Sequence, residues 1–288
     1  MSIKTILVPL SGDDSDPVAL SAAFTVARLF DAHVDSLFVK LDPRDAVPML
    51  GEGMSGAMVD EIMRAAETEA NSQLTTARRH FGEVVRREQV DLREGPPALD
   101  GISARWREVV GRAEEVVPHE GRLSDLLVFA HGTGERDAQA YATLETALLG
   151  AARPLLLVPK GGLTAIGRKV VVAWNGSAEG ARAVAGAMPF LRQADSVQVL
   201  TAETSVTPAA AGRRIAEYLS WHGVNCQLTI VRSGSEPVGQ MLTGKAAELG
   251  ADLLVMGGYG HSRMREMILG GVTRYVLGHA GLPVLMAH

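Results

Sequence analysis

The sequence is poor in cysteine, which limits its covalent chemistry. Cys226 is the only cysteine among 288 residues, so no disulfide can form within the chain. Chains without disulfides are typical of reducing compartments. No neighbouring residue suggests that the Cys226 thiol is activated. We therefore expect Cys226 to be a small core residue rather than a nucleophile.

Long apolar runs are missing as well. No stretch approaches the length of a membrane-spanning helix, and the residues after Met1 lack the apolar region and cleavage site of a signal peptide. The formal net charge of −5 argues against a nucleic-acid surface as the main function. With 47% hydrophobic and 21% charged residues, the composition is that of a globular protein. We expect a cytoplasmic protein with no nucleic-acid or membrane partner.

What the sequence does contain is an alternation of strand and helix patterns, and the alternation occurs twice. Alternating elements of this kind predict βαβ units and a mainly parallel sheet. In the first half we expect strands at 6–10, 34–39, 103–110, 125–129 and 155–158, with helices at 18–30, 58–87, 112–120 and 138–151. In the second half we expect strands at 170–174, 196–201, 227–231, 253–256 and 284–286, with helices at 178–192, 208–222, 236–249 and 272–279.

Short stretches of sequence also recur between the halves. Asp125-Leu126-Leu127-Val128 matches Asp252-Leu253-Leu254-Val255, and a Pro-x-Leu ending follows each at Pro154 and Pro283. Gly12 precedes Asp125 by 113 residues and Gly176 precedes Asp252 by 76, so the first half is longer by 37 residues, which fall within 41–102. We predict a domain at 1–160, a glycine-rich linker at 161–167 and a second domain at 168–288.

The most informative stretch lies near the end of the chain. The buried-strand pattern of 253–256 stops at Gly257, Gly258 and Gly260, and a second glycine pair, Gly270-Gly271, opens the helix expected at 272–279. Glycine lets the backbone approach a ligand closely, and a helix N-terminus offers unpaired N–H groups to an anion. The stretch therefore predicts phosphate binding, with two tight turns of no further function as the alternative.

This stretch resembles the nucleotide loop of the universal stress protein family, whose pattern is G-x2-G-x9-G-(S/T). Gly257, Gly260 and Gly270 match it, and Gly271 stands where the family has Ser or Thr. The hydroxyl that would meet a phosphate is thus missing, and Thr273 is the candidate to replace it. The resemblance extends over nearly the whole chain as two fused domains. It implies two Rossmann-like or flavodoxin-like domains, each with a five-stranded, mainly parallel sheet.

The resemblance also implies a site and an assembly. The family carries an Asp after its first strand that touches the adenosine, and Asn175 occupies this position. An Asn175-Gly176 turn without ligand contact is the alternative. The implied ligand is ATP, which Mg²⁺ could accompany, or a related adenine nucleotide. The implied assembly is an internal pseudo-dimer in which 155–158 pairs with 284–286, and a further homodimer is open. The site residues that we predict are Ala173, Asn175, Met256, Gly257, Gly260, His261, Ser262, Gly270, Gly271, Val272 and Thr273.

The matching site of the first half departs from the pattern. Its loop, 130–135, is about two residues shorter, and Tyr141 and Ala142 stand where the second half has Gly270 and Gly271. We therefore expect no triphosphate site there. The segment 11–15, Ser-Gly-Asp-Asp-Ser, is similar to the pyrophosphate loop of adenylating enzymes, which have a related fold, but Asp13 replaces its second glycine. An Asp or Ser cap on the helix that Pro17 starts is the interpretation that we favour.

The leading hypothesis is a stress-response protein that binds an adenine nucleotide in its second half. A nucleotide-free interaction or chaperone-like module and a weak ATP hydrolase are the alternatives. No pair of base and nucleophile is visible, so we expect no strong catalysis and no metal site. We further expect Trp174 and Trp221 in the core, and a core face for Met49, Met54, Met58 and Met63.

Overall fold

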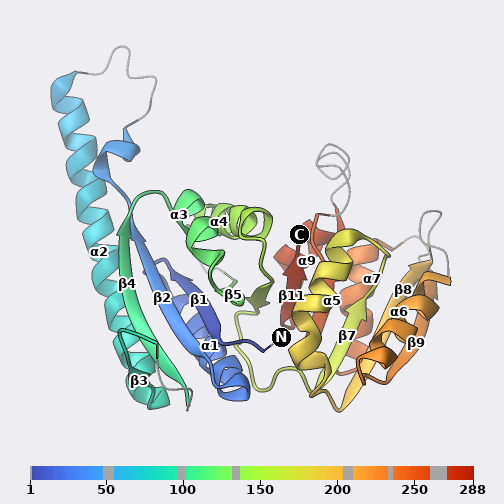
Figure 1. The fold of residues 1–288 in the computed structure, drawn as a ribbon. Helices are drawn as coiled ribbons and strands as arrows, with labels where there is room; N and C mark the ends of the chain where they lie inside the picture. Colours follow the sequence, from blue (N-terminus) through green and yellow to red (C-terminus); the bar gives the residue numbers. More distant parts are fainter. Residues whose placement is uncertain are drawn as a thin grey trace. The chain divides into compact units, whose positions relative to one another are not determined.

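The computed structural model describes residues 2–47, 55–96, 101–131, 137–203, 210–232, 236–259 and 271–288. The contacts of the chain divide it into two compact units (Figure 1). The N-terminal unit is Ile3–Ala151, and the C-terminal unit consists of Met1–Ser2 together with Ala152–His288.

The N-terminal unit is a parallel sheet with helices on both faces (Figure 1). Its strands lie in the order β3-β4-β2-β1-β5, and α1 packs against α2 while α3 packs against α4. Leu7 and Val8 on β1 and Leu126 and Leu127 on β5 are almost fully buried, which explains their uninterrupted apolar pattern. The elements in chain order are β1 Thr5–Leu10, α1 Asp16–Phe30, β2 His33–Lys40, the 3₁₀ helix η1 Pro43–Ala46, α2 Gly56–Glu88, β3 Asp91–Leu92, β4 Ser103–Val110, α3 Ala113–Gly121, β5 Leu126–Ala130 and α4 Asp137–Gly150.

The C-terminal unit repeats this plan, with strands in the order β6-β11-β10-β7-β8-β9. All its strand pairs are parallel except β6 and β11, which are antiparallel with Leu285 opposite Leu156. This confirms the predicted pairing of 155–158 with 284–286. Its elements are β6 Leu155–Val158, β7 Lys169–Ala173, α5 Ala178–Leu191, β8 Ser196–Glu203, α6 Ala210–Trp221, β9 Cys226–Arg232, α7 Val238–Glu248, β10 Leu253–Gly257, α9 Val272–His279 and β11 Val284–Ala287.

The α/β fold class and its mainly parallel sheet are thus confirmed, and the main strands and helices lie close to their predicted ranges. The two-residue strand β3 was not predicted, because two residues are too few to show a pattern. The division of contacts groups β6 with the C-terminal unit. The domain ranges 1–160 and 168–288, with their linker, stay predictions, as does the packing of the halves as a pseudo-dimer.

The extra length of the N-terminal half forms η1 and the 33-residue helix α2. The buried residues of α2 all lie between Ala70 and Val85, and this part packs against α1 and β2. The turns before Ala70 contain no buried residue, and Met58 is 53% exposed. The predicted core face is therefore wrong for Met58, and Met49 and Met54 lie outside the described residues.

The tryptophans differ from the prediction in one case. Trp174 is half-buried, but Trp221 is 83% exposed at the end of α6, so the expected core position is wrong. The amphipathic face of α6 buries Ile215 and Leu219 instead, and Trp221 falls on the opposite side of the helix. Cys226 is half-buried at the start of β9, and burial raises the pKa of its thiol, which disfavours the reactive thiolate.

Candidate functional site

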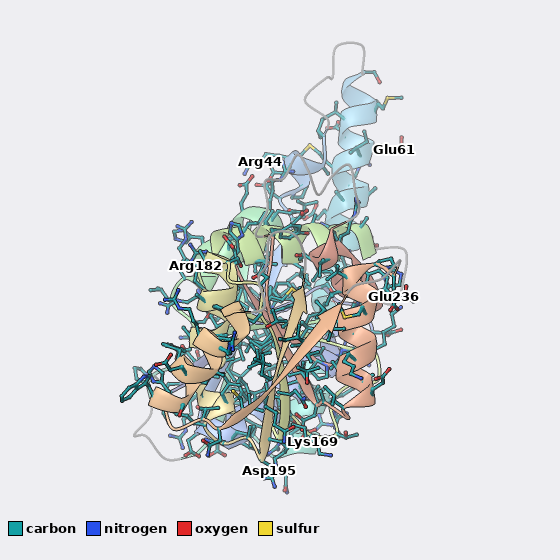
Figure 2. The ribbon with its side chains drawn as sticks, turned by 90° about the vertical axis from the view of Figure 1, so that its right-hand side faces the viewer. Arg44, Glu61, Lys169, Arg182, Asp195 and Glu236 are labelled. Carbon is teal, nitrogen blue, oxygen red and sulfur yellow. The ribbon has the colours of Figure 1, made fainter. Side chains whose placement is uncertain are left out.

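The carboxyl ends of β7 and β10 lie side by side in the C-terminal unit. Ala173 at the end of β7 is in register with Met256 near the end of β10. In a parallel sheet this rim is where ligands bind, at the point where the strand order reverses. Lys169 and Asp195 lie at the opposite rim, near the amino ends of β7 and β8, whereas Glu236 precedes α7 (Figure 2). The structure thus brings Ala173, Asn175, Met256 and Gly257 together, as predicted.

Gly257 is where the backbone of β10 approaches the first turn of α5. A Cβ atom at this position would lie 2.5 Å from the Gly180 amide nitrogen and 3.0 Å from the Glu179 Cβ. Only glycine fits such a contact without moving the backbone. Gly257 therefore packs against a helix of the unit itself, in addition to any role toward a ligand.

Asn175 begins a turn that caps α5. Its Oδ1 accepts a hydrogen bond of 3.1 Å from the Ser177 N–H, and the Ser177 Oγ accepts one of 3.0 Å from the Gly180 N–H. These contacts agree with the turn interpretation of Asn175-Gly176. The Asn175 side chain is exposed, so its amide Nδ2 faces solvent at the rim.

Glu179 is an acidic residue in the first turn of α5. A hydrogen bond from its own backbone N–H lowers the pKa of Glu179; burial opposes this effect, while the Ser177 hydroxyl, Arg182 and His288 reinforce it. The carboxylate compensates the positive end of the helix dipole. Our sequence reasoning did not single out Glu179, although an acidic residue in the first turn of a helix is the signal for such a cap.

Helix α9 begins differently. Its N-cap is Gly271, with φ −55° and ψ 157°, which has no side chain that could cap the helix. No acidic residue lies in its first turn, where Arg274 is exposed and forms no ion pair with any residue in the described part of the chain. A cation at a helix N-terminus is unfavourable unless an anion is near. Arg274 was also missed, because the family pattern ends before it.

Thr273 is 3% exposed, in the first turn of α9. Its Oγ1 accepts a hydrogen bond of 3.0 Å from the backbone N–H of Tyr259, which follows β10. The hydroxyl oxygen is therefore engaged within the unit rather than presented at the surface. Val272 lies beside it, half-buried. The remaining predicted residues, Gly260, His261, Ser262 and Gly270, lie outside the described residues.

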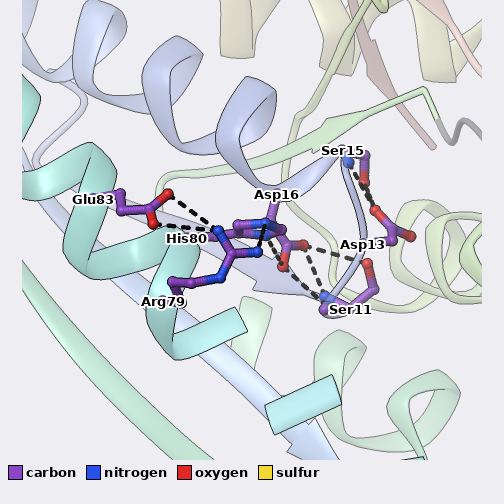
Figure 3. Close-up of polar contacts among 8 residues, drawn as sticks. Ser11, Asp13, Ser15, Asp16, Arg79, His80 and Glu83 are labelled. Carbon is purple, nitrogen blue, oxygen red and sulfur yellow. Dashed lines mark hydrogen bonds and ion pairs between the residues drawn. The ribbon is translucent and has the colours of Figure 1, made fainter. Parts of the chain in front are cut away.

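The corresponding turn of the N-terminal unit, which follows β1, is occupied by the side chain of Asp16 (Figure 3). Asp16 is 2% exposed and accepts hydrogen bonds of 2.9 Å from the backbone N–H groups of Ser11 and Gly12. A Cβ atom at Gly12, whose φ is +77°, would lie 2.5 Å from the Gln73 carbonyl oxygen of α2. Helix α2 thus lies directly against the backbone of this turn.

His80 closes the same turn from α2. It is 5% exposed, and its Nδ1 lies 3.6 Å from the Asp16 Oδ2, beyond hydrogen-bond distance. Arg79 approaches the other ring nitrogen, Nε2, at 3.1 Å. Since a guanidinium group can only donate, the Nε2 of His80 is the acceptor of this contact.

The 11–15 segment does not form the side-chain cap by Asp or Ser that we expected. Ser15 is the N-cap of α1 but makes no side-chain cap hydrogen bond. Asp13 instead accepts from the Ser15 N–H at 2.8 Å and from its Oγ at 2.6 Å, so the two side chains bond to each other. The helix starts at Asp16, one residue before Pro17. Tyr141 is half-buried in α4, and residues 132–136 of the matching loop lie outside the described part.

No group of three or more His, Cys, Asp or Glu side chains among the described residues is placed to hold a metal ion. Among the same residues, no helix combines the length and the apolar character of a membrane span.

Comparison with known proteins identifies a family domain in the second half of the chain and similar folds for the whole of it. Residues 167–288 match the model of the Universal stress protein family. No curated protein matches the sequence. A universal stress protein from Archaeoglobus fulgidus DSM 4304 is 15% identical with a TM-score of 0.66, covering 99% of this chain and 96% of its own.

Two further solved structures are similar. A putative universal stress protein from Pseudomonas aeruginosa UCBPP-PA14 is 17% identical with a TM-score of 0.58, covering 98% and 92% of the two chains. A universal stress protein solved in complex with cAMP is 28% identical with a TM-score of 0.36; it covers 42% of this chain and 96% of its own. The fold of nearly the whole chain is therefore that of solved universal stress proteins, and residues 167–288 are a domain of the universal stress protein family.

Proposed function

We propose that the C-terminal unit binds an adenine nucleotide at the carboxyl ends of β7 and β10, with the phosphates at the first turn of α9. The observation that carries the proposal is the uncompensated N-terminus of α9. It has no side-chain cap and no acidic residue in its first turn, and it carries the exposed Arg274. Both the helix dipole and the guanidinium group attract an anion.

The N-terminus of the neighbouring helix α5 is less suited to a phosphate than that of α9. Ser177 and Glu179 already satisfy the N-terminus of α5, so a phosphate group would meet a carboxylate there. The adenosine end of the ligand fits the other part of the rim. Ala173 and Met256 supply an apolar floor, and Asn175 offers its exposed amide as a donor.

ATP, which Mg²⁺ could accompany, is the nucleotide that the resemblance favours, and a stress-response function in the cytoplasm follows from the same resemblance. ADP, AMP and cAMP are the ligands to compare with it. cAMP belongs in the comparison because a universal stress protein has been solved in complex with it. The described residues offer no pair of base and nucleophile at this rim, and the proposal is therefore one of binding rather than turnover.

The test is isothermal titration calorimetry of the full chain with each of the four nucleotides, together with mass spectrometry of ligand released from the purified protein. We expect one site per chain with an affinity in the micromolar range, about −8 kcal/mol. If none of the four binds with a Kd below about 1 mM, the proposal is wrong, and the nucleotide-free interaction module becomes the better hypothesis.

A further inference from the structure

Tyr259 is held in a backbone conformation that side chains rarely adopt. Four described residues other than glycine have positive φ angles: Asp31, Gln89, Ala152 and Tyr259. Asp31 and Gln89 cap the C-termini of α1 and α2, and Ala152 follows the end of α4, which are usual places for this conformation. Tyr259, with φ 56°, instead follows a strand, β10. Such a conformation persists only where the surrounding structure fixes it.

A hydrogen bond of the Tyr259 backbone connects this residue to α9. The Tyr259 N–H points to the Thr273 Oγ1, 14 residues further along the chain, at 3.0 Å. The bond joins the residues that follow β10 to the first turn of α9. Thr273 is almost fully buried, so water does not compete for the interaction.

The remaining contacts of α9 hold its body rather than its first turn. Tyr275 packs against α7, where a Cβ atom added at Gly239 would lie 2.9 Å from the Tyr275 ring. The His279 Nδ1 lies 2.9 Å from the carbonyl oxygen of Tyr275 near the C-terminal end of the helix. At the N-terminal end no side chain caps the helix, which is only eight residues long. A short helix without a cap frays easily at its first turn.

We propose that Thr273 is a positioning residue of the nucleotide site: its hydroxyl holds the first turn of α9 against the end of β10, so that the free N–H groups of this turn face the phosphates. The inference rests on the proposed function. It assigns Thr273 a role different from the one expected from the sequence, in which its hydroxyl itself meets a phosphate. The contact needs an acceptor oxygen, and the shape of the side chain alone cannot supply it.

The test uses two substitutions that separate the hydroxyl from the shape. Thr273→Val keeps the branched shape and removes the acceptor, whereas Thr273→Ser keeps the acceptor and removes a methyl group. Thr243→Val is the matched control, because the Thr243 hydroxyl bonds only to carbonyl oxygens of its own helix, α7. Nucleotide affinity is measured by calorimetry well below the melting temperature of each variant. Hydrogen exchange of the Tyr259 amide is measured without nucleotide.

We expect Thr273→Val to weaken nucleotide binding at least tenfold and to speed exchange of the Tyr259 amide. The affinities of Thr273→Ser and Thr243→Val should stay within about twofold of that of the parent protein. Equal affinity of Thr273→Val and the parent would overturn the inference, and so would equal losses for Val and Ser. A parent protein that binds no nucleotide would overturn the proposed function and the positioning role with it. Fast Tyr259 exchange in Thr273→Val would in that case still identify the hydrogen bond as a purely structural contact.

Discussion

The first strand of each unit ends in a turn that leads into a helix, and the two turns differ in what occupies them. After β1 the buried Asp16 carboxylate accepts hydrogen bonds from two backbone N–H groups, and α2 lies against the Gly12 backbone. After β7 the exposed Asn175 accepts a hydrogen bond from the Ser177 N–H. A Cβ atom at Gly176 in this turn would meet nothing within 4 Å, whereas one at Gly12 would contact the backbone of α2. Among the described residues, the turn of the N-terminal unit is thus covered by a buried carboxylate and by the long helix α2, and the turn of the C-terminal unit is not.

The expected absence of a triphosphate site in the N-terminal half gains a physical argument from this comparison. The sequence argument rested on the shorter loop 130–135 and on Tyr141 and Ala142, which replace the glycine pair of the second half. In the structure the closed turn lies elsewhere, at the end of β1, and it is closed by α2, which belongs to the extra segment of the N-terminal half. Two separate features of this unit thus argue against a ligand there, and its absence stays a prediction.

The largest effect that we predict concerns the closed turn. Asp16→Ala should lower the free energy of unfolding of the N-terminal unit by about 3 kcal/mol, because the buried Gly12 N–H and the part-buried Ser11 N–H lose their carboxylate acceptor. Asn175→Ala, its counterpart in the open turn, should cost less than about 1 kcal/mol, since its one bond is exposed. Hydrogen exchange resolved by unit measures both. Similar losses for the two variants would show that the turns do not differ energetically.

A second difference between the units is a charged side chain on β2 whose counterpart on β8 is neutral. Asp35 on β2 pairs with Arg105 at 2.7 Å, whereas Gln198, at the matching register on β8, makes a neutral hydrogen bond to Thr229. Burial raises the pKa of Asp35, but the nearby His33 side chain, the hydrogen bonds and charge of Arg105 and the charge of Arg107 outweigh it, so that the pKa lies well below its usual range.

This difference predicts acid sensitivity of the N-terminal unit. A depressed pKa stabilises the fold above the unfolded value, near pH 4, and the contribution is lost as the pH falls toward the folded pKa. Asp35→Asn should cost roughly 2 kcal/mol at pH 7, and its difference from the parent should shrink below about pH 4. Denaturant unfolding at several pH values measures the stability difference between Asp35→Asn and the parent. Asp91→Asn is the control, because the Asp91 side chain is 75% exposed. A constant difference across this pH range would contradict the prediction.

Local patterns were sufficient to predict the fold, and distant contacts explain what they missed. The apolar run of β10 and the alternation around it indicate a parallel sheet because these signals lie within a few residues. The Asp16 and Gly12 contacts join α1 and α2 across more than fifty residues, and no motif marks them. At the rim, Ala173, Asn175, Met256 and Gly257 could be placed from strand ends alone. The Tyr259–Thr273 bond could not, since it depends on a backbone conformation that the sequence does not show.

The third prediction sharpens the contrast between the two helix N-termini of the C-terminal unit. Arg274→Ala should weaken nucleotide binding about fivefold, roughly 1 kcal/mol, because a cation beside the α9 N-terminus would be lost. The effect should fade as salt rises, since an exposed charge is screened. Arg213→Ala, which removes an exposed arginine from α6, is the matched control. If the two variants bind alike at low salt, the phosphates do not lie at α9.

The smallest effect that we predict is a gain, at Gly271. The φ and ψ angles of Gly271, −55° and 157°, are close to those of Ser55 (−73°, 151°) and Ser177 (−78°, 162°), whose hydroxyls cap α2 and α5. Because φ is negative, a side chain causes no backbone strain, and a serine hydroxyl there can accept from the Arg274 N–H as the other two caps do. Gly271→Ser should therefore raise the stability of the C-terminal unit by a few tenths of a kcal/mol.

The same hydroxyl can instead donate to a phosphate oxygen, as the Ser or Thr of the family pattern would. We expect the affinity for nucleotide to rise about threefold, a gain limited because the hydroxyl must leave its cap or share it. Gly161→Ser is the control, since a Cβ at Gly161 meets nothing within 4 Å. Thermal unfolding and calorimetry together decide the outcome: a more stable variant with weaker nucleotide binding would mean that the serine competes with the phosphate for the same N–H groups. That result would place the phosphate on the first turn of α9 but remove the hydroxyl from the list of its contacts.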